Sequence, residues 1–221
     1  MVDSIFLTPL LDSYKELNIV EINTEYIKIV GFLRLEHSYE LIPYSERFEV
    51  EIVIPRNYPI MLPSIKETGG ALDRKYEHIN HEGTLCLEVE RAIRSKLSPK
   101  YDLIEWIEEF VFPYFYSYCY HRDYGSYPFG DRSHGAKGIL EYYKELLKEN
   151  TLEETRDLLN AIKYYKLEKK YKGHNMCPCG SFKKIRDCHK LEKLKQLSIY
   201  ADQQMIKDLK LIEWEERIYE N

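Results

Sequence analysis

The feature that most constrains the fold is an alternating apolar run followed at once by closely spaced prolines. In FEVEIVIP, residues 48–55, every second side chain is apolar, which is typical of a half-buried strand. The prolines that follow, Pro55, Pro59 and Pro63, exclude a helix and favour an extended crossing. The β-branched and aromatic run at residues 26–37 predicts a second strand, and we expect an antiparallel pair.

Helical patterns flank the predicted strands. Three helices are expected in the first part of the chain, over residues 8–17, 98–112 and 136–150. Thr8 and Ser98 are the expected N-caps of the first two, and Pro113 is expected to end the second. Residues 66–97 are interpreted as a long irregular loop. Strands and helices in this order predict an α+β fold.

The rest of the chain is predicted to be helical on both sides of a cysteine-rich segment. Thr151 and Glu154 form a capping box that opens a charged helix. We therefore predict a domain over residues 1–150, a helical linker over 151–173, a metal-binding module over 174–190 and a C-terminal helix over 191–221.

Charge is distributed unevenly along the chain. The formal net charge is −5, but residues 162–195 contain 11 Lys/Arg against 3 Asp/Glu. This asymmetry indicates different partners for the two parts. The N-terminal residues lack the basic start and cleavage site of a signal peptide, and no apolar run approaches the roughly 20 residues of a membrane span. We expect a cytoplasmic protein, where cysteines are more often catalytic or metal-binding than disulfide-bonded.

The segment CPCGSFKKIRDCH contains four potential metal ligands: Cys177, Cys179, Cys188 and His189. Three thiolates and an imidazole suit tetrahedral Zn²⁺, and a site whose four ligands all come from the protein is structural rather than catalytic. The alternative is an unrelated group of residues, which so tight a clustering disfavours. Because so short a segment has almost no core, the metal would supply its folding energy.

This segment resembles the SEC-C motif, found at the tail of the SecA translocation ATPase and in many bacterial proteins. The two lysines of the motif are present as Lys183 and Lys184, whereas Phe182 replaces the second glycine of the usual GSG, which leaves the turn less permissive. The resemblance implies a docking module for a protein or for nucleic acid. We favour a protein, because few aromatic residues are interleaved with the positive charges.

The stretch HINHEGTLCLEVE, residues 78–90, raises a separate question about Cys86. A free cysteine is most often a buried core residue, and it can also be a metal ligand or a nucleophile. A loop position after the turn residue Gly83 is compatible with an exposed nucleophile.

The order of features around Cys86 resembles the ubiquitin-conjugating enzymes over roughly residues 5–115. That family has an alternating strand, a proline-rich crossing similar to PRNYPIMLP, a glycine three residues before the catalytic cysteine and an acidic residue two after it. Here these residues are Gly83, Cys86 and Glu88. The resemblance implies a thioester acceptor at Cys86.

The chain departs from that family where an asparagine normally lies eight residues before the cysteine, because His78 occupies this position. His78 could donate a hydrogen bond to the oxyanion or help deprotonate an incoming amine. It could equally be a loop residue without a chemical role. Asn80 and His81 are second choices, and His134 is a weak candidate. Cys119, which lies among aromatic residues, is interpreted as core.

The segment YPFGDRSHG and the helix after it resemble the conjugating-enzyme-like proteins of bacterial CBASS anti-phage operons. That resemblance implies a protein partner, the C-terminus of a cGAS/DncV-like nucleotidyltransferase, and an activating enzyme. Two alternatives remain open: a catalytically inactive binding adaptor of the same fold, and a nucleic-acid-binding zinc protein.

Overall fold

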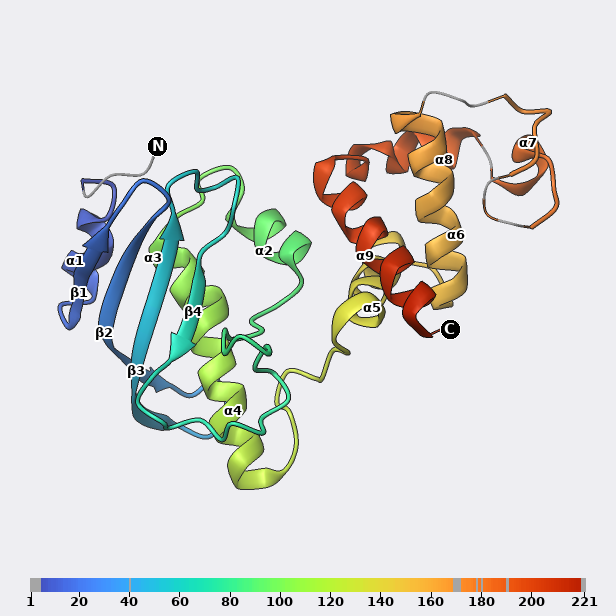
Figure 1. Ribbon diagram of the computed structural model, residues 1–221. Helices are drawn as coiled ribbons and strands as arrows, with labels where there is room; N and C mark the ends of the chain where they lie inside the picture. Colours follow the sequence, from blue (N-terminus) through green and yellow to red (C-terminus); the bar gives the residue numbers. More distant parts are fainter. Residues whose placement is uncertain are drawn as a thin grey trace. The chain divides into compact units, whose positions relative to one another are not determined.

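In the computed structural model, four strands form one antiparallel sheet in the order β1-β2-β3-β4 (Figure 1). The strands are β1 Leu17–Ile22, β2 Tyr26–His37, β3 Tyr44–Pro55 and β4 Ser64–Glu67. The structure describes residues 5–39, 41–168, 172–177, 179, 181–189 and 191–219. The predicted α+β class is confirmed. The predicted strand over residues 26–37 is β2, and the alternating run 48–55 is the end of β3, which begins earlier, at Tyr44.

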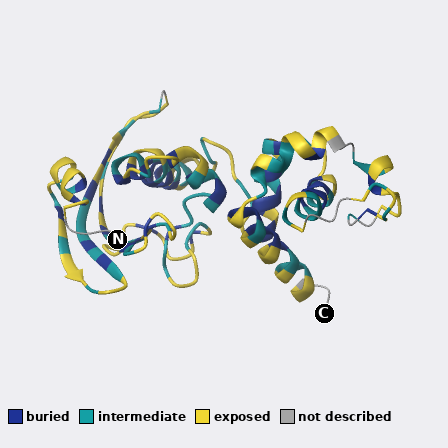
Figure 2. Ribbon diagram, turned by 90° about the horizontal axis from the view of Figure 1, so that it is seen from above, coloured by how far each residue is buried: buried dark blue, intermediate teal, exposed yellow. Residues whose placement is uncertain are grey.

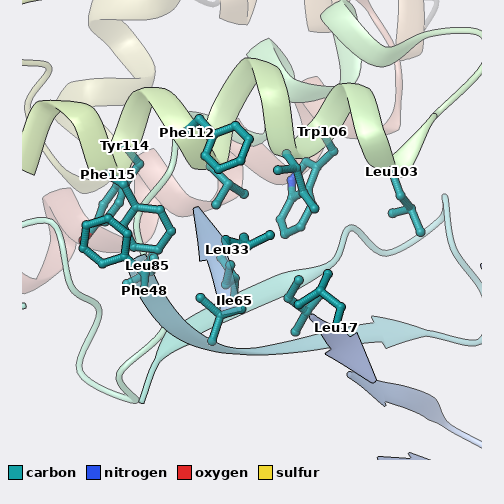
Figure 3. Packing of buried hydrophobic residues seen from close by; sticks show 14 of the residues in the cluster. Leu17, Leu33, Phe48, Ile65, Leu85, Leu103, Trp106, Phe112, Tyr114 and Phe115 are labelled. Atoms are coloured by element: carbon teal, nitrogen blue, oxygen red, sulfur yellow. The ribbon is translucent and has the colours of Figure 1, made fainter. Parts of the chain in front are cut away.

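The alternation of β3 places one face of the sheet in the core. Phe48, Val50, Ile52 and Ile54 are all at most 1% exposed. Phe48 pairs with Leu33 of β2 and stacks on the ring of Phe115, with centroids 4.0 Å apart. Figure 3 shows these side chains packed under the helix that crosses the sheet, and Figure 2 shows the buried residues gathered on the facing sides. Removing a ring from such a core typically costs about 3–5 kcal/mol.

The helix that crosses the sheet begins and ends differently from the prediction. It consists of α3 Leu103–Trp106, the π-helical segment η1 Ile107–Val111 and α4 Phe112–Tyr124. Its N-cap is Asp102, whose carboxylate accepts the backbone N–H groups of residues 104 and 105, whereas Ser98 is the C-cap residue of a preceding helix. Pro113 lies in the first turn of α4 and does not end the helix, because a proline is tolerated where its missing N–H is not needed.

Two shorter helices also differ from their predicted form. Helix α1 spans Thr8–Ser13 with Leu7 at its N-cap position, so Thr8 is the first helical residue and not the cap. Helix α2, Glu90–Leu97, lies within the segment interpreted as irregular, and it buries Ile93 and Leu97.

The chain divides into two compact units, Met1–Gly130 and Asp131–Asn221. The second contains α5 Gly135–Leu147, α6 Leu152–Ile162, η2 Lys163–Leu167, α7 Ile185–Cys188, α8 Leu191–Leu197, η3 Ser198–Tyr200 and α9 Gln203–Tyr219. The capping box of Thr151 and Glu154 is present at the start of α6. The predicted C-terminal helix is interrupted at η3, so it forms two helices.

Helix α5, which lies within the predicted first domain, packs against α6 and α9 of the second unit. The reason is its apolar face, whose Tyr143 is fully buried and donates a hydrogen bond to Asp208 of α9 at 2.8 Å. In the described part of the chain, every helix is too short or too polar to cross a membrane.

Candidate functional site

Cys86 lies at the end of a small hairpin that begins at His78. The Cys86 N–H donates to the His78 carbonyl at 2.8 Å, and the Asn80 N–H donates to the Thr84 carbonyl at 2.8 Å. Between them the Gly83 N–H closes a turn onto the Asn80 carbonyl, also at 2.8 Å, and Gly83 has a φ of +86° that favours glycine. The hairpin thereby holds His78 and Cys86, eight positions apart in the sequence, opposite each other.

Leu85 fixes this hairpin on the edge of the sheet. Its N–H donates to the Ile65 carbonyl of β4 at 2.8 Å, and its side chain belongs to the buried core cluster that also contains Phe48 (Figure 3). Because successive side chains of an extended segment point to opposite sides, burial of Leu85 directs Cys86 away from the core. Cys86 is accordingly only partly buried.

Two tyrosines of α4, one helical turn apart, hold the loop that leads to Cys86. The Tyr114 hydroxyl donates to the His78 carbonyl at 3.0 Å. The Tyr118 hydroxyl donates to the Ala71 carbonyl and accepts the Asp73 N–H, both at 3.0 Å. The loop therefore has defined anchoring points on a rigid helix.

Glu67, at the end of β4, organises the beginning of the same loop. Its carboxylate accepts four consecutive backbone N–H groups, of residues 69, 70, 71 and 72, at 2.8 to 3.4 Å. Backbone donors that would otherwise need water are satisfied within the loop, which supports an ordered path toward Cys86.

The side chains of His78 and Cys86 lie close together. A ring nitrogen of His78 is within 4.8 Å of the Cys86 sulfur. The imidazole packs between two tyrosine rings, Tyr76 at 5.3 Å and Tyr127 at 5.2 Å between centroids. At this separation a small movement brings an imidazole nitrogen into proton-transfer range of the sulfur.

The environment of Cys86 keeps its thiol protonated. Burial raises the pKa of the Cys86 thiol, and the nearby Glu88 carboxylate raises it further. A thiol with a raised pKa carries little thiolate at neutral pH, but the thiolate that forms is the stronger nucleophile.

Four further residues were singled out in the sequence: Asn80, His81, His134 and Cys119. Asn80 uses its side chain within the hairpin, where its amide donates to the Thr84 hydroxyl at 3.0 Å, and His81 is exposed. His134 is the N-cap residue of α5, in the second unit. Cys119 is fully buried on α4, as expected of a core residue, and burial raises its pKa to about 12.

In the second unit, the predicted ligands form one cluster. The ligand atoms of Cys177, Cys179, Cys188 and His189 all lie within 4.8 Å of one another. The sulfur atoms of Cys179 and Cys188 are 3.5 Å apart. None of the five cysteines, all of which are described, forms a disulfide bond. This cluster could hold a metal ion such as zinc.

The orientation of His189 supports this reading. Its Nε2 atom is buried and lacks a hydrogen-bond partner among the described residues. Burial lowers the pKa of His189, so the neutral imidazole, which is the ligating form, predominates at pH 7. A buried nitrogen without a partner is costly in a protein, and a metal ion removes that cost.

A short antiparallel bridge between Met176 and Lys184 builds the cluster. The Cys177 N–H donates to the Lys183 carbonyl at 2.8 Å, and α7 then carries Cys188 back toward the first cysteine pair. Ile185, 1% exposed, supplies the apolar anchor of this segment. Gly180 follows the first cysteine pair in the sequence, where a glycine would relax the turn, and it lies outside the described residues.

Searches against protein families, curated proteins and solved structures found no match to this chain. What the structure itself defines is an α+β protein with a four-stranded antiparallel sheet and a C-terminal group of three cysteines and one histidine. Sequence reasoning missed Tyr114, Tyr118 and Glu67. The only available signal for the tyrosines was their spacing of four residues in a segment too aromatic to single them out.

Proposed function

We propose that this chain is a bacterial ubiquitin-conjugating-like transferase that carries an acyl group as a thioester on Cys86. The observation that supports the proposal most is the approach of a His78 ring nitrogen to within 4.8 Å of the Cys86 sulfur. The antiparallel sheet followed by a crossing helix is compatible with the resemblance to conjugating enzymes.

In the proposed reaction, the Cys86 sulfur attacks the carbonyl carbon of a thioester or acyl adenylate. The carbon–sulfur bond forms, the leaving group departs with the electron pair, and the thiol proton passes to His78 or water. In the second step an amine attacks the new thioester, and Cys86 leaves as the thiolate. His78 then serves either as donor to the oxyanion or as acceptor of the amine proton.

The proposed acyl donor is the C-terminus of a cGAS/DncV-like nucleotidyltransferase in a CBASS anti-phage operon, delivered by an activating enzyme. This choice rests on the resemblance of residues 127–135. We also place the protein in the cytoplasm, because free thiols persist in a reducing compartment.

For the C-terminal cluster we propose a structural Zn²⁺ site of SEC-C type. Cys177, Cys179, Cys188 and His189 would hold the ion, and a complete set of protein ligands leaves no position for substrate. The ion would contribute folding energy to the segment around it.

A catalytically inactive adaptor of the same fold is the second candidate. Two observations favour it: the pKa of the Cys86 thiol is raised rather than lowered, and His78 replaces the usual asparagine. Such a protein would use the sheet and the cysteine-rich module only for binding.

Loading with a synthetic acyl donor separates the two candidates. The full-length protein is incubated with a short peptide that ends in a mercaptoethanesulfonate thioester, and its intact mass is measured. A transferase gains the peptide as an adduct that a reducing thiol removes, and Cys86→Ala abolishes the adduct. Cys86→Ser is the matched control, because its oxyester would resist reducing thiols. Absence of any adduct on the folded wild-type chain supports the adaptor.

A further inference from the structure

Phe182 has an unusual position in the cysteine-rich module. It lies in the turn between the cysteine pair and α7, and its side chain is 90% exposed. Its φ is +56°, in the left-handed region that disfavours any residue with a Cβ atom. The protein therefore keeps a large apolar ring in water at a position where glycine would be conformationally easier.

Such a combination has no folding benefit within the described structure. An exposed ring buries almost no apolar area, and a left-handed conformation at a non-glycine residue persists only when something else requires it. Conformational strain of this kind is concentrated at functional sites, which makes the ring of Phe182 a candidate contact for a ligand.

The surroundings of Phe182 are cationic. Residues 172–189 include four Lys/Arg, at 172, 183, 184 and 186, against the single carboxylate of Asp187. Asp187 pairs with Arg186 at 3.7 Å on the exposed surface, so within the described residues the three lysines have no carboxylate partner. Zn²⁺ with three thiolates and a neutral imidazole would add one negative charge, and the loaded module would still carry an excess of about two positive charges.

We propose that the Phe182 turn binds single-stranded nucleic acid, with a base stacked on the Phe182 ring and phosphates bound by Lys183 and Lys184. Every base has a π-face, and an exposed aromatic beside cations is the arrangement that reads single strands without sequence preference. The sequence pattern alone favoured a protein partner, and the observation that favours nucleic acid is the 90% exposure of the Phe182 ring directly beside Lys183 and Lys184. This proposal does not depend on the transferase function.

The test uses the zinc-loaded full-length protein and a fluorescently labelled oligothymidylate of about 20 nucleotides, with binding followed by anisotropy at about 50 mM salt. The wild type should bind, and binding should weaken as salt rises. Phe182→Gly should weaken it about tenfold, the size of one lost stacking contact, whereas Phe182→Trp should retain it. The Lys183→Gln/Lys184→Gln double variant should lower the salt slope by about 1.4.

Two measurements keep a folding defect apart from a binding defect. Because Phe182→Gly relieves the left-handed strain, this variant should hold its zinc at least as well as the wild type in a chelator titration. Lys75→Gln/Lys100→Gln, in the first unit, removes the same charge far along the chain and should leave the salt slope unchanged.

Three results would overturn the proposal. The first is that the zinc-loaded wild type does not bind the oligonucleotide, and the second is that Phe182→Gly binds it as tightly as the wild type. The third is that poly-glutamate competes for binding as well as unlabelled oligonucleotide does. The last result would identify the turn as a docking surface for an acidic protein.

Discussion

At Cys86, burial and the neighbouring Glu88 carboxylate act on the thiol in the same direction. Both favour the neutral form, so the pKa of the thiol is raised. A His78 ring nitrogen within 4.8 Å of the sulfur is the base that we propose for removing this proton. A nucleophile protected in this way would react slowly with unrelated electrophiles, since the thiolate and not the thiol is the reactive species.

The raised pKa predicts the pH dependence of Cys86 alkylation. Below the raised pKa the rate should increase about tenfold per pH unit, and it should still be rising at pH 9, where a free cysteine approaches its plateau. The measurement is iodoacetamide labelling of native and denatured protein across pH 6–10, read at Cys86 by mass spectrometry. Cys119 is the internal control, because its burial should prevent labelling in the native state. A plateau for native Cys86 below pH 8 would contradict this account.

At the scale of elements, α4 does more than cover the sheet. Its buried face stacks on Phe48, while the hydroxyls of Tyr114 and Tyr118 hold the loop before Cys86. The abundance of tyrosine, with 20 in the chain, has a structural reason here: the rings fill the core and the hydroxyls satisfy loop backbone groups.

Removing these hydroxyls should loosen the loop without emptying the core. Tyr118→Phe removes the partner of two backbone groups, the Ala71 carbonyl and the Asp73 N–H, in partly buried hydrogen bonds and should lower the free energy of unfolding by about 1–3 kcal/mol, and Tyr114→Phe by about 1 kcal/mol. Hydrogen exchange of residues 71–86 should accelerate in both variants. Tyr120→Phe is the matched control, because within the described residues its hydroxyl makes no hydrogen bond. Equal exchange in all three variants would exclude the proposed anchoring role.

Local patterns predicted some elements and failed for others, for identifiable reasons. Strand β3 was predictable because apolar and polar side chains alternate along its consecutive residues. Strand β4 has only four residues, too few for such a pattern, and it is defined by its pairing with β3. Both Ser98 and Asp102 are typical caps, and only the path of the chain decides that Asp102 begins the helix. The contact of Tyr114 with His78 joins residues 36 positions apart, and no local pattern contains that information.

At the scale of the whole molecule, each of the two units is built around apolar residues of its own, but the cysteine-rich segment has few. Ile185 and Cys177 are the buried apolar side chains in the described part of residues 172–189. The spacing of the four ligands was predictable from sequence, because a metal site needs particular residue types close together. The extents predicted for the four parts of the chain remain predictions.

Metal removal should therefore act locally. If the cluster holds zinc as proposed, stripping the metal from the full-length protein with a chelator should increase hydrogen exchange of residues 174–189 at least about tenfold, because the metal would supply most of their folding energy. Peptides covering β3 and α4 should keep their protection. Cys188→Ala should reproduce the effect of the chelator, and Cys86→Ala should not. Unchanged exchange in residues 174–189 would argue against a structural metal site.

We propose that the folded site around Cys86 promotes transfer of an acyl group to an amine. The most direct measurement loads Cys86 with the peptide thioester and compares the rate of transfer to free lysine in the folded chain and in the same chain unfolded by guanidinium. We expect the rate in the folded chain to be at least about tenfold faster. His78→Ala should lower this rate, and His78→Asn should retain it if the imidazole acts as a hydrogen-bond donor. A folded rate equal to or below the unfolded rate would contradict the claim.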